Sequence, residues 1–269
     1  MTDPRQGQGG YWDGNLDPNN LGAQFSRTRY NYPRELAFYL TPDQKCALMH
    51  MGEVKNKWTL DLGAGIGTNS LYLSRHGAKV IAADIALERL RALMAVNKGL
   101  PAKTGAIYPV RCAAEHLPFR RDSLDREYSK SVLIHTKLPR AVGELNRILK
   151  PEGHAVFVEP LAGNPLVNLY RATLAPKIWQ QITTYFTRQE LDVIANGMAA
   201  GEPRYFYLSA FLGFVWQFAL PVPPLFRFSV SVLNAVDSAI LRVFPRLRMR
   251  SWFVVIPAGK KTETPAVEG

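Results

Sequence analysis

The stretch TLDLGAGIGTNSLYLS, residues 59–74, decides the fold. Apolar, strand-like residues run into a turn that contains Gly63, Gly65 and Gly67, and a helical pattern begins at Thr68. A strand that enters a helix through a glycine turn places bare backbone at the carboxyl edge of a sheet, where α/β proteins bind their ligands. We therefore expect this turn to line a small-molecule site.

The segments after this turn repeat the alternation of a short apolar strand with a helix. Strands are predicted at 78–85, 108–115, 126–129 and 154–160, with helices from Leu87 and from Pro139 and a KPEG turn at 150–153. Such alternation is typical of parallel βαβ units, so residues up to about 160 are predicted to form a doubly wound α/β core. Beyond it we expect a helix at 186–197 and strands at 204–211 and 251–259.

We divide the chain into four parts: an N-terminal arm and helix (1–50), the α/β core (51–211), an apolar helical insertion (212–250), and the last strand with the tail (251–269). The arm is polar except for Tyr11 and Trp12, which are aromatic enough to dock on some surface, and a helix is predicted from about Arg34. The polar N-terminus does not resemble a secretory signal. Two unpatterned cysteines, Cys46 and Cys112, indicate neither a disulfide framework nor a metal site. We therefore expect a cytoplasmic location.

The charge is strongly basic and unevenly placed. The chain carries 33 basic and 22 acidic residues, a net charge of +11. Between Pro203 and Lys261 there are eight basic residues against one acid, Asp237. A basic surface suits nucleic acid, an anionic membrane or an anionic substrate, and charge alone does not choose among them.

Two ligand classes commonly occupy a glycine turn of this type. A dinucleotide site has the spacing G-x-G-x-x-G, but here the spacing is Gly63-x-Gly65-x-Gly67 and Asp61 precedes it. An acid before the turn suits the cationic end of S-adenosylmethionine. Asp84 ends the next strand, where a carboxylate can accept both ribose hydroxyls. The pattern favours S-adenosylmethionine over NAD.

At this point the sequence resembles class I S-adenosylmethionine-dependent methyltransferases. DLGAGIG, the acid of AAD, RCAAEHLPF, SLDREYSKSVLIHT and LNRILKPEGHAVFVEP follow in the order and spacing of that family, over about Trp58 to Pro160. They look most like the branch that contains quinone-biosynthesis and other small-molecule enzymes. The resemblance implies a Rossmann-like, mostly parallel seven-stranded sheet with helices on both faces, and S-adenosyl-L-methionine as the cofactor.

The resemblance also implies roles for individual residues. Those expected to bind the cofactor are Asp61, Gly63, Gly65 and Gly67 at the methionine end, Asp84 with its neighbour Ile85 at the ribose, Ala114 and Glu115 beside the adenine, and Ser129. The chain departs from the family at Ala113, where an acid often reaches the adenine amino group. It also departs at Arg126 and Glu127 in the normally apolar fourth strand, which is either short or holds one of them in an unusual environment.

Methyl transfer is an in-line displacement that needs alignment and, for a hydroxyl or an acidic carbon, removal of a proton. His135 is the preferred base because imidazole titrates near neutrality, with packing or helix capping as its alternative role. Glu159, at the end of the fifth strand, is a second catalytic candidate. Asn164 and Arg171 are predicted to touch the acceptor, and Tyr30 and Tyr32 to close over the cofactor or to pack on the core.

The acceptor is predicted to be a small, hydrophobic or lipid-like molecule. Enzymes that methylate bases commonly carry an Asn or Asp, two prolines and an aromatic after the fourth strand, where this chain has SKSV, so nucleic acid is disfavoured. Within Leu225 to Phe244, Arg227, Ser231, Asn234, Ser238 and Arg242 form a narrow polar stripe on an otherwise apolar helix. Its charges and prolines disfavour a membrane span. The segment fits peripheral contact with an anionic membrane, a cap on the sheet, or contact with another subunit.

Two other functions stay open on the sequence alone. One is a membrane-associated scaffold that keeps the cofactor fold without catalysis. The other is a transferase that moves another group from the same type of cofactor. The oligomeric state is not predicted.

Overall fold

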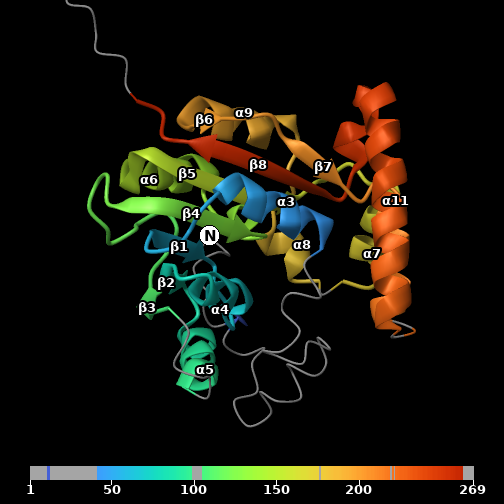
Figure 1. Ribbon diagram of the computed structural model, residues 1–269. Coiled ribbons are helices and arrows are strands. Elements are labelled where there is room, and N and C mark those ends of the chain that lie inside the picture. The colour runs from blue at the N-terminus through green and yellow to red at the C-terminus, as the bar shows by residue number, and fades with distance from the viewer. Residues whose placement is uncertain are drawn as a thin grey trace, which may run out of the picture.

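The computed structural model describes residues 11–12, 41–98, 105–175, 177–218, 220 and 222–262. Within them, eight strands form one sheet in the order β3-β2-β1-β4-β5-β8-β6, and β7 also pairs with β8 (Figure 1). Strands β1 to β5 are parallel, and β8 runs antiparallel to β5. The strands are β1 (Trp58–Leu62), β2 (Lys79–Asp84), β3 (Ile107–Arg111), β4 (Leu124–Lys130), β5 (Leu149–Pro160), β6 (Ala199–Ala200), β7 (Arg204–Phe206) and β8 (Phe253–Gly259).

The predicted fold class, a mostly parallel Rossmann-like sheet with helices on both faces, is confirmed. Individual strands differ from the prediction. The strand expected at 204–211 is wrong beyond Phe206, because Tyr207 has a positive φ of 64° and its ring is buried. The short β6 adds an eighth strand, and β3 ends at Arg111. The expected KPEG turn lies within β5, where the register against β4 shifts between Leu124 and Arg126.

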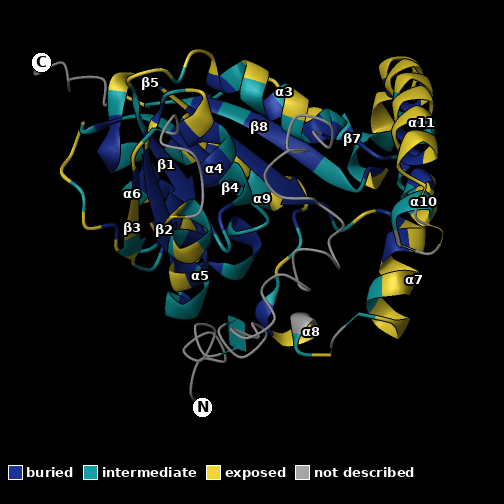
Figure 2. Cartoon of the chain, turned by 60° about the horizontal axis from the view of Figure 1, so that its bottom comes forward, coloured by how far each residue is buried: buried dark blue, intermediate teal, exposed yellow. Residues whose placement is uncertain are grey.

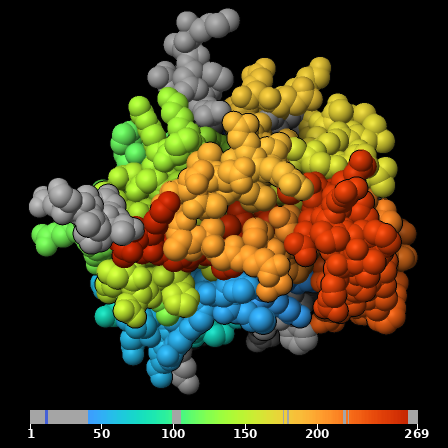
Figure 3. All heavy atoms as spheres, turned by 90° about the horizontal axis from the view of Figure 1, so that it is seen from above, coloured from blue at the N-terminus to red at the C-terminus, as the bar shows by residue number. Residues whose placement is uncertain are grey.

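Helices pack on both faces of the sheet (Figure 2). The α-helices are α3 (Pro42–Met51), α4 (Thr68–Arg75), α5 (Leu87–Lys98), α6 (Leu138–Ile148), α7 (Pro165–Thr173), α8 (Trp179–Ile182), α9 (Arg188–Gly197), α10 (Val215–Phe218) and α11 (Pro223–Val243). Short 3₁₀ helices are η3 (Leu133–His135), η4 (Ala210–Phe214) and η5 (Pro245–Arg250). The space-filling view from above shows α9 across the middle and α11 at one end (Figure 3). Except for Tyr11 and Trp12, the predicted arm, Tyr30, Tyr32 and the helix before Thr41 lie outside the described residues.

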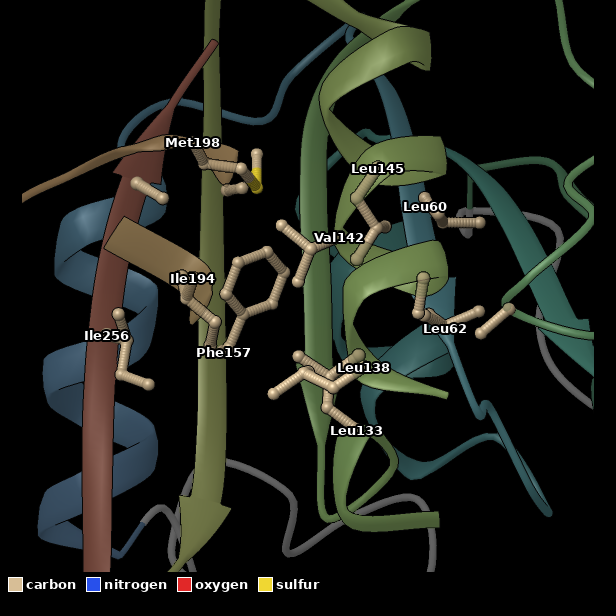
Figure 4. Close-up of a cluster of buried hydrophobic side chains, with 14 of the residues drawn as sticks. Leu60, Leu62, Leu133, Leu138, Val142, Leu145, Phe157, Ile194, Met198 and Ile256 are labelled. Atoms are coloured by element: carbon tan, nitrogen blue, oxygen red, sulfur yellow. The ribbon is translucent and has the colours of Figure 1, made fainter. Parts of the chain in front are cut away.

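Two buried clusters hold the helices to the sheet, because successive side chains of a strand point to opposite faces. Leu60 and Leu62 of β1 join Phe157 of β5 in a cluster to which α6 contributes Val142 and α9 contributes Ile194 (Figure 4). The opposite cluster packs α3, α4 and α5 on the other face of the sheet and continues to α11. Burial on both faces explains the apolar runs VIAA of β2 and AVFV of β5, whereas β4, LDREYSK, is mostly polar.

Glu127 is a buried acid in the middle of β4. Strand β4 has its full length, and Glu127 pairs across it with Leu60 of β1 and Ala155 of β5. Its side chain is buried, and neither carboxyl oxygen has a hydrogen-bond partner among the described residues. Burial raises the pKa of Glu127 well above its usual 4.5, against the opposing charge of Lys260. The predicted unusual environment in β4 is therefore that of a buried acid that favours its protonated form.

Replacing Glu127 with methionine, which has a similar length, should stabilise the protein at pH 8. The folded-state pKa is raised, so above pH 4.5 the unfolded chain loses this proton first and the free energy of unfolding falls as pH rises. We expect Glu127→Met to raise the free energy of unfolding at pH 8 by about 1–3 kcal/mol, the cost of an unsatisfied buried polar group. Urea denaturation at pH 5 and pH 8 measures both effects.

Glu127→Gln is the matched control, because it removes the titration but keeps a polar group in the same place. We expect it to flatten the pH dependence as Glu127→Met does, with a smaller gain in stability. A methionine variant that is less stable than the parent at pH 8 would contradict this account of β4.

Candidate functional site

The turn between β1 and α4 forms one wall of the site. Gly63 and Ala64 donate backbone hydrogen bonds to the Ala83 carbonyl at the end of β2, at 2.8 and 3.0 Å. Gly63 has a φ of 68°, and a Cβ atom there would lie 2.1 Å from a Val132 methyl carbon. At Gly67, with a φ of 89°, a Cβ would lie 2.0 Å from the Leu93 side chain. Glycine is therefore required at both positions, by backbone conformation and by close packing.

Asp84 connects this turn to the second strand. Its Oδ2 accepts a hydrogen bond from the Gly65 N–H at 2.7 Å, and its Oδ1 accepts one from the Ala86 N–H at 2.8 Å. The side chain is nearly buried, and burial raises the pKa of Asp84 above its usual value although these donors favour the ionised form. Each carboxylate oxygen has a second lone pair, so Asp84 can accept further hydroxyl donors from a ligand.

Residues 131–135, directly after β4, form another wall of the site, and Glu159 holds them in place. The Glu159 carboxylate accepts backbone hydrogen bonds from Val132, Leu133 and Ile134 at 3.0 to 3.4 Å, and one from the Ser129 hydroxyl at 3.3 Å. Glu159 is fully buried, and burial raises its pKa to about 7 despite these four donors. Its carboxylate thus anchors η3, the short helix that ends at His135.

The His135 ring is oriented by the backbone that precedes Thr183. Its Nδ1 lies 3.0 Å from the Ile182 carbonyl oxygen. The Thr183 hydroxyl lies 3.4 Å from the same Nδ1. Because the nearer carbonyl only accepts, this contact favours the tautomer with the proton on Nδ1, in which the lone pair of the neutral ring lies on Nε2. This tautomer can act as a proton acceptor.

Trp12 belongs to the N-terminal arm and lies across the site. Its ring meets the His135 ring edge-on, with centroids 5.5 Å apart, and the Arg89 guanidinium lies 4.9 Å above the Trp12 ring centroid. Arg89 also donates from Nε to the Trp12 carbonyl at 3.0 Å. The indole therefore bridges α5 on one wall and η3 on the other.

These elements border an open cavity of about 450 Å³ at the carboxyl edge of β1 to β4. This volume is in the range of small-molecule sites. Its lining residues are Trp12, Leu62, Gly63, Gly65, Asp84, Ile85, Arg89, Cys112, Ala113, Ala114, Glu115, His116, Lys130, Ser131, Val132, His135, Thr136, Lys137 and Arg140. The backbone of Gly63 and Gly65 and the acid Asp84 lie at one end of this lining. The small side chains of Ala113 and Ala114 come from the segment after β3, and His135 comes from η3.

Residues 60–157 match the family described as "Methyltransferase domain". The matched part contains the glycine turn, Asp84 and His135. This part of the chain is a class I S-adenosylmethionine-dependent methyltransferase domain.

Two curated relatives carry the same domain. The chain is 31% identical over 138 residues to the "Uncharacterized methyltransferase YodH" of Bacillus subtilis, an alignment that covers 50% of this chain and 54% of YodH. It is 34% identical over 131 residues to the demethylmenaquinone methyltransferase of Clavibacter sepedonicus, with 46% of this chain and 52% of that protein covered. The chain thus spans about half the length of these curated relatives.

Solved structures share the fold over a longer part of the chain. The geranyl diphosphate C-methyltransferase of Streptomyces coelicolor A3(2), solved with Mg²⁺, geranyl-S-thiolodiphosphate and S-adenosyl-L-homocysteine, superposes with a TM-score of 0.63. The superposition covers 97% of this chain and 99% of that one at 14% identity. At this identity the likeness shows the fold alone, and the fold extends past the matched domain.

The methyltransferase domain brings seven of the residues predicted from sequence to one cavity. They are Gly63, Gly65, Asp84, Ile85, Ala114, Glu115 and His135. Ala113, the departure from the family pattern, lines the same part of the cavity as Ala114. Their roles toward the cofactor stay predictions, but their meeting at one edge of the sheet is a structural fact.

Four other predicted residues lie behind the cavity wall. Asp61 is buried beneath the turn and accepts a 2.5 Å hydrogen bond from the Ser70 hydroxyl of α4. Burial raises the pKa of Asp61 to about 7. Gly67 packs against Leu93, and Ser129 and Glu159 bond to each other below η3. In this structure their contacts support the lining residues.

The two predicted acceptor contacts lie outside the lining of the cavity. Asn164 caps α7: its Oδ1 accepts hydrogen bonds from the Leu166 and Val167 N–H groups at 3.2 and 3.1 Å. Arg171 of α7 stacks 3.6 Å from the ring centroid of Tyr185 and donates to the Leu161 carbonyl at 2.8 Å. The structure gives both residues local roles, and contact with the acceptor stays a prediction.

Sequence reasoning did not select several charged or aromatic residues of the lining, among them Trp12, Arg89 and Lys130. Trp12 was noted only as an aromatic in a polar arm, and Arg89 lies in the first turn of α5. Lys130 ends β4 and pairs with the buried Asp43 of α3 at 2.7 Å. A basic residue at the carboxyl end of a parallel strand is a signal that could have found Lys130, because such ends meet at the ligand edge.

Proposed function

We infer that this protein transfers a methyl group from S-adenosylmethionine to a small, hydrophobic or lipid-like acceptor. One observation carries the inference. The glycine turn and Asp84, joined by the hydrogen bond from the Gly65 N–H, border the same 450 Å³ cavity as His135. The glycine turn with its acid, which suits a nucleoside, and the candidate proton acceptor thus border one cavity.

The residues present fit this cofactor. The Asp84 carboxylate has lone pairs for a ribose diol, and Ile85, Ala113 and Ala114 offer an apolar surface to an adenine ring. The backbone at Gly63 and Gly65 has no side chain, so a ligand can approach it closely. When bound, the cofactor supplies an electrophilic methyl group on a sulfonium.

The residues of this chain would orient the reactants and remove a proton. His135 would accept it at Nε2 from an acceptor hydroxyl or acidic carbon, because Nδ1 donates to the Ile182 carbonyl. Glu159 would act as a positioning residue, since its carboxylate holds three successive N–H groups of the backbone that leads to His135. Trp12 would shield this end of the cavity from water, which strengthens electrostatic interactions inside it.

The acceptor class is proposed from the apolar surface near the site and from the relatives. The acceptors in their names are demethylmenaquinone and geranyl diphosphate, which are different molecules. A shared cofactor site therefore does not fix the acceptor. The apolar side chains of Trp12, Leu62 and Val132 in the cavity lining favour an acceptor with a large apolar part.

The test has two steps. Isothermal titration calorimetry should show binding of S-adenosylmethionine and S-adenosylhomocysteine but not of NAD. Incubation with methyl-labelled S-adenosylmethionine and a panel of hydrophobic hydroxyl, amine and quinol compounds should then label at least one of them.

Each alternative predicts a different result. A non-catalytic scaffold would bind the cofactor and label no compound. A transferase of another group would modify a compound without incorporating the labelled methyl. Tight binding of NAD would overturn the cofactor assignment itself.

A further inference from the structure

Helix α11 exposes an apolar face to solvent. Leu225, Phe228, Val232, Val236 and Val243 are all exposed, Phe228 to 68%. At 3.6 residues per turn these five positions fall within an arc of roughly 80°. The opposite side of the helix packs on the protein through Phe226, Val230 and Leu241. The helix thus has two apolar faces, of which the protein body covers one.

A second exposed apolar face lies on α7 at the same end of the molecule. Leu166, Leu169, Tyr170 and Leu174 are exposed and recur at helical spacing. Figure 2 colours most of α7 and of the outer side of α11 as exposed, and Figures 1 and 3 place both helices at this end. We call these nine side chains on α7 and α11 the apolar end face.

Hydrogen bonds fix the two helices to one short segment between them. Asn164, at the start of α7, donates from Nδ2 to the Leu208 carbonyl at 3.3 Å. The next residue, Ser209, donates from its N–H and hydroxyl to Asp237 of α11, and Ala210 donates its N–H to the same carboxylate. Asp237 is 1% exposed. Both parts of the apolar end face are therefore held on one rigid support.

The hydrogen bonds to Asp237 also exclude an arrangement in which α11 spans a membrane. Among the described residues, this is the one helix long and apolar enough to cross a bilayer. Crossing would remove Asp237 from its Ser209 and Ala210 donors and place a carboxylate in hydrocarbon. A helix of about 30 Å that stays packed on the protein can instead lie along the surface of a membrane.

Basic side chains lie beside the apolar end face. Arg227 and Arg242 lie on the polar stripe beside the exposed apolar arc, and Arg246 and Arg250 of η5 are exposed next to its end. From residue 203 to residue 262 the single acid is Asp237, which is buried and bonded. No acid lies between residues 162 and 175. The surface is therefore complementary to an anionic partner.

We propose that the apolar end face docks this protein on an anionic lipid bilayer, with α11 lying in the interface. Phe228 and Val232 enter the apolar boundary, and Arg227 and Arg242 contact lipid headgroups. A second copy of the chain is a poorer occupant, because a twofold contact through this face would bring the same arginines close to one another. The proposal does not depend on methyl transfer and is tested without cofactor or acceptor.

The test is sedimentation of the full-length protein with phosphatidylcholine vesicles that contain or lack phosphatidylserine. The protein should pellet with the anionic vesicles and be released by high salt. Phe228→Ser/Val232→Ser should weaken this binding about 10- to 100-fold through the loss of two inserted apolar side chains. Arg227→Gln/Arg242→Gln should weaken it about tenfold or more, through headgroup contacts alone.

Two controls match these variants elsewhere on the surface. Met49→Ser removes an apolar side chain of α3 that is 78% exposed, and Arg120→Gln/Arg121→Gln removes two exposed charges from the segment before β4. Both should pellet like the parent. Equal pelleting of parent and Phe228→Ser/Val232→Ser would overturn the proposal. So would a dimer in sedimentation equilibrium that this double variant dissociates, because it assigns the face to a second copy.

Discussion

Replacing Asp84 with alanine should weaken binding of S-adenosylhomocysteine about 100-fold. The expected loss corresponds to hydrogen bonds from ribose hydroxyls to a charged acceptor, each worth about 1.5–3 kcal/mol. In the structure the carboxylate borders the cavity and is held in place by the Gly65 and Ala86 N–H groups. Calorimetric titration of parent and variant measures the change in Kd.

Two further variants separate the ribose contact from damage to the turn. Asp84→Asn keeps an acceptor oxygen for one of the Gly65 and Ala86 N–H groups and should be more thermally stable than Asp84→Ala while still losing affinity. Glu152→Gln removes an exposed acid from the bulged start of β5 and should bind as the parent does. An unchanged Kd in Asp84→Ala would contradict the ribose assignment and leave the cavity without a nucleoside site.

The meeting of the glycine turn and Asp84 could be predicted because it follows from topology. Each lies directly after a strand in its own βα unit, and β1 and β2 are parallel neighbours. The carboxyl ends of such strands come together whatever the helices between them contain. Strong local patterns therefore located both the sheet and the cofactor edge of the site.

Glu159 shows where this reasoning fails. It ends a strand at the same edge, yet its side chain turns beneath η3 and binds three backbone N–H groups instead of lining the cavity. Periodicity places a residue at an edge but does not say whether the next loop folds over it. Asn164 is similar, since its N-cap role depends on where α7 begins.

Trp12 could not be placed from sequence for another reason. Its contacts with Arg89 and His135 join positions more than seventy residues apart. Nothing in the arm is periodic, so no local pattern says which surface it covers. Tertiary packing decides such contacts.

His135→Gln should lower kcat by about 10²- to 10⁴-fold for acceptors that must lose a proton, because this is the usual contribution of a general base. Its Nδ1 donates to the Ile182 carbonyl, which leaves the lone pair on Nε2. Affinity for S-adenosylhomocysteine should change little, because Asp84 and the glycine turn lie on the other wall of the cavity. Single-turnover transfer of labelled methyl to an acceptor found in the panel measures the chemical step.

The matched comparison is Glu159→Gln, which weakens the anchor of η3 without touching the reacting atoms. We expect a smaller fall in kcat, about tenfold, with the shape of the pH profile retained, because the base is displaced but still present. In the parent, kcat should rise with pH as the general base loses its proton, and His135→Gln should abolish this rise. His76→Gln changes an exposed histidine at the C-cap of α4 and should behave as the parent. If His135→Gln kept both kcat and the pH profile, the base would have to be another residue of the cavity.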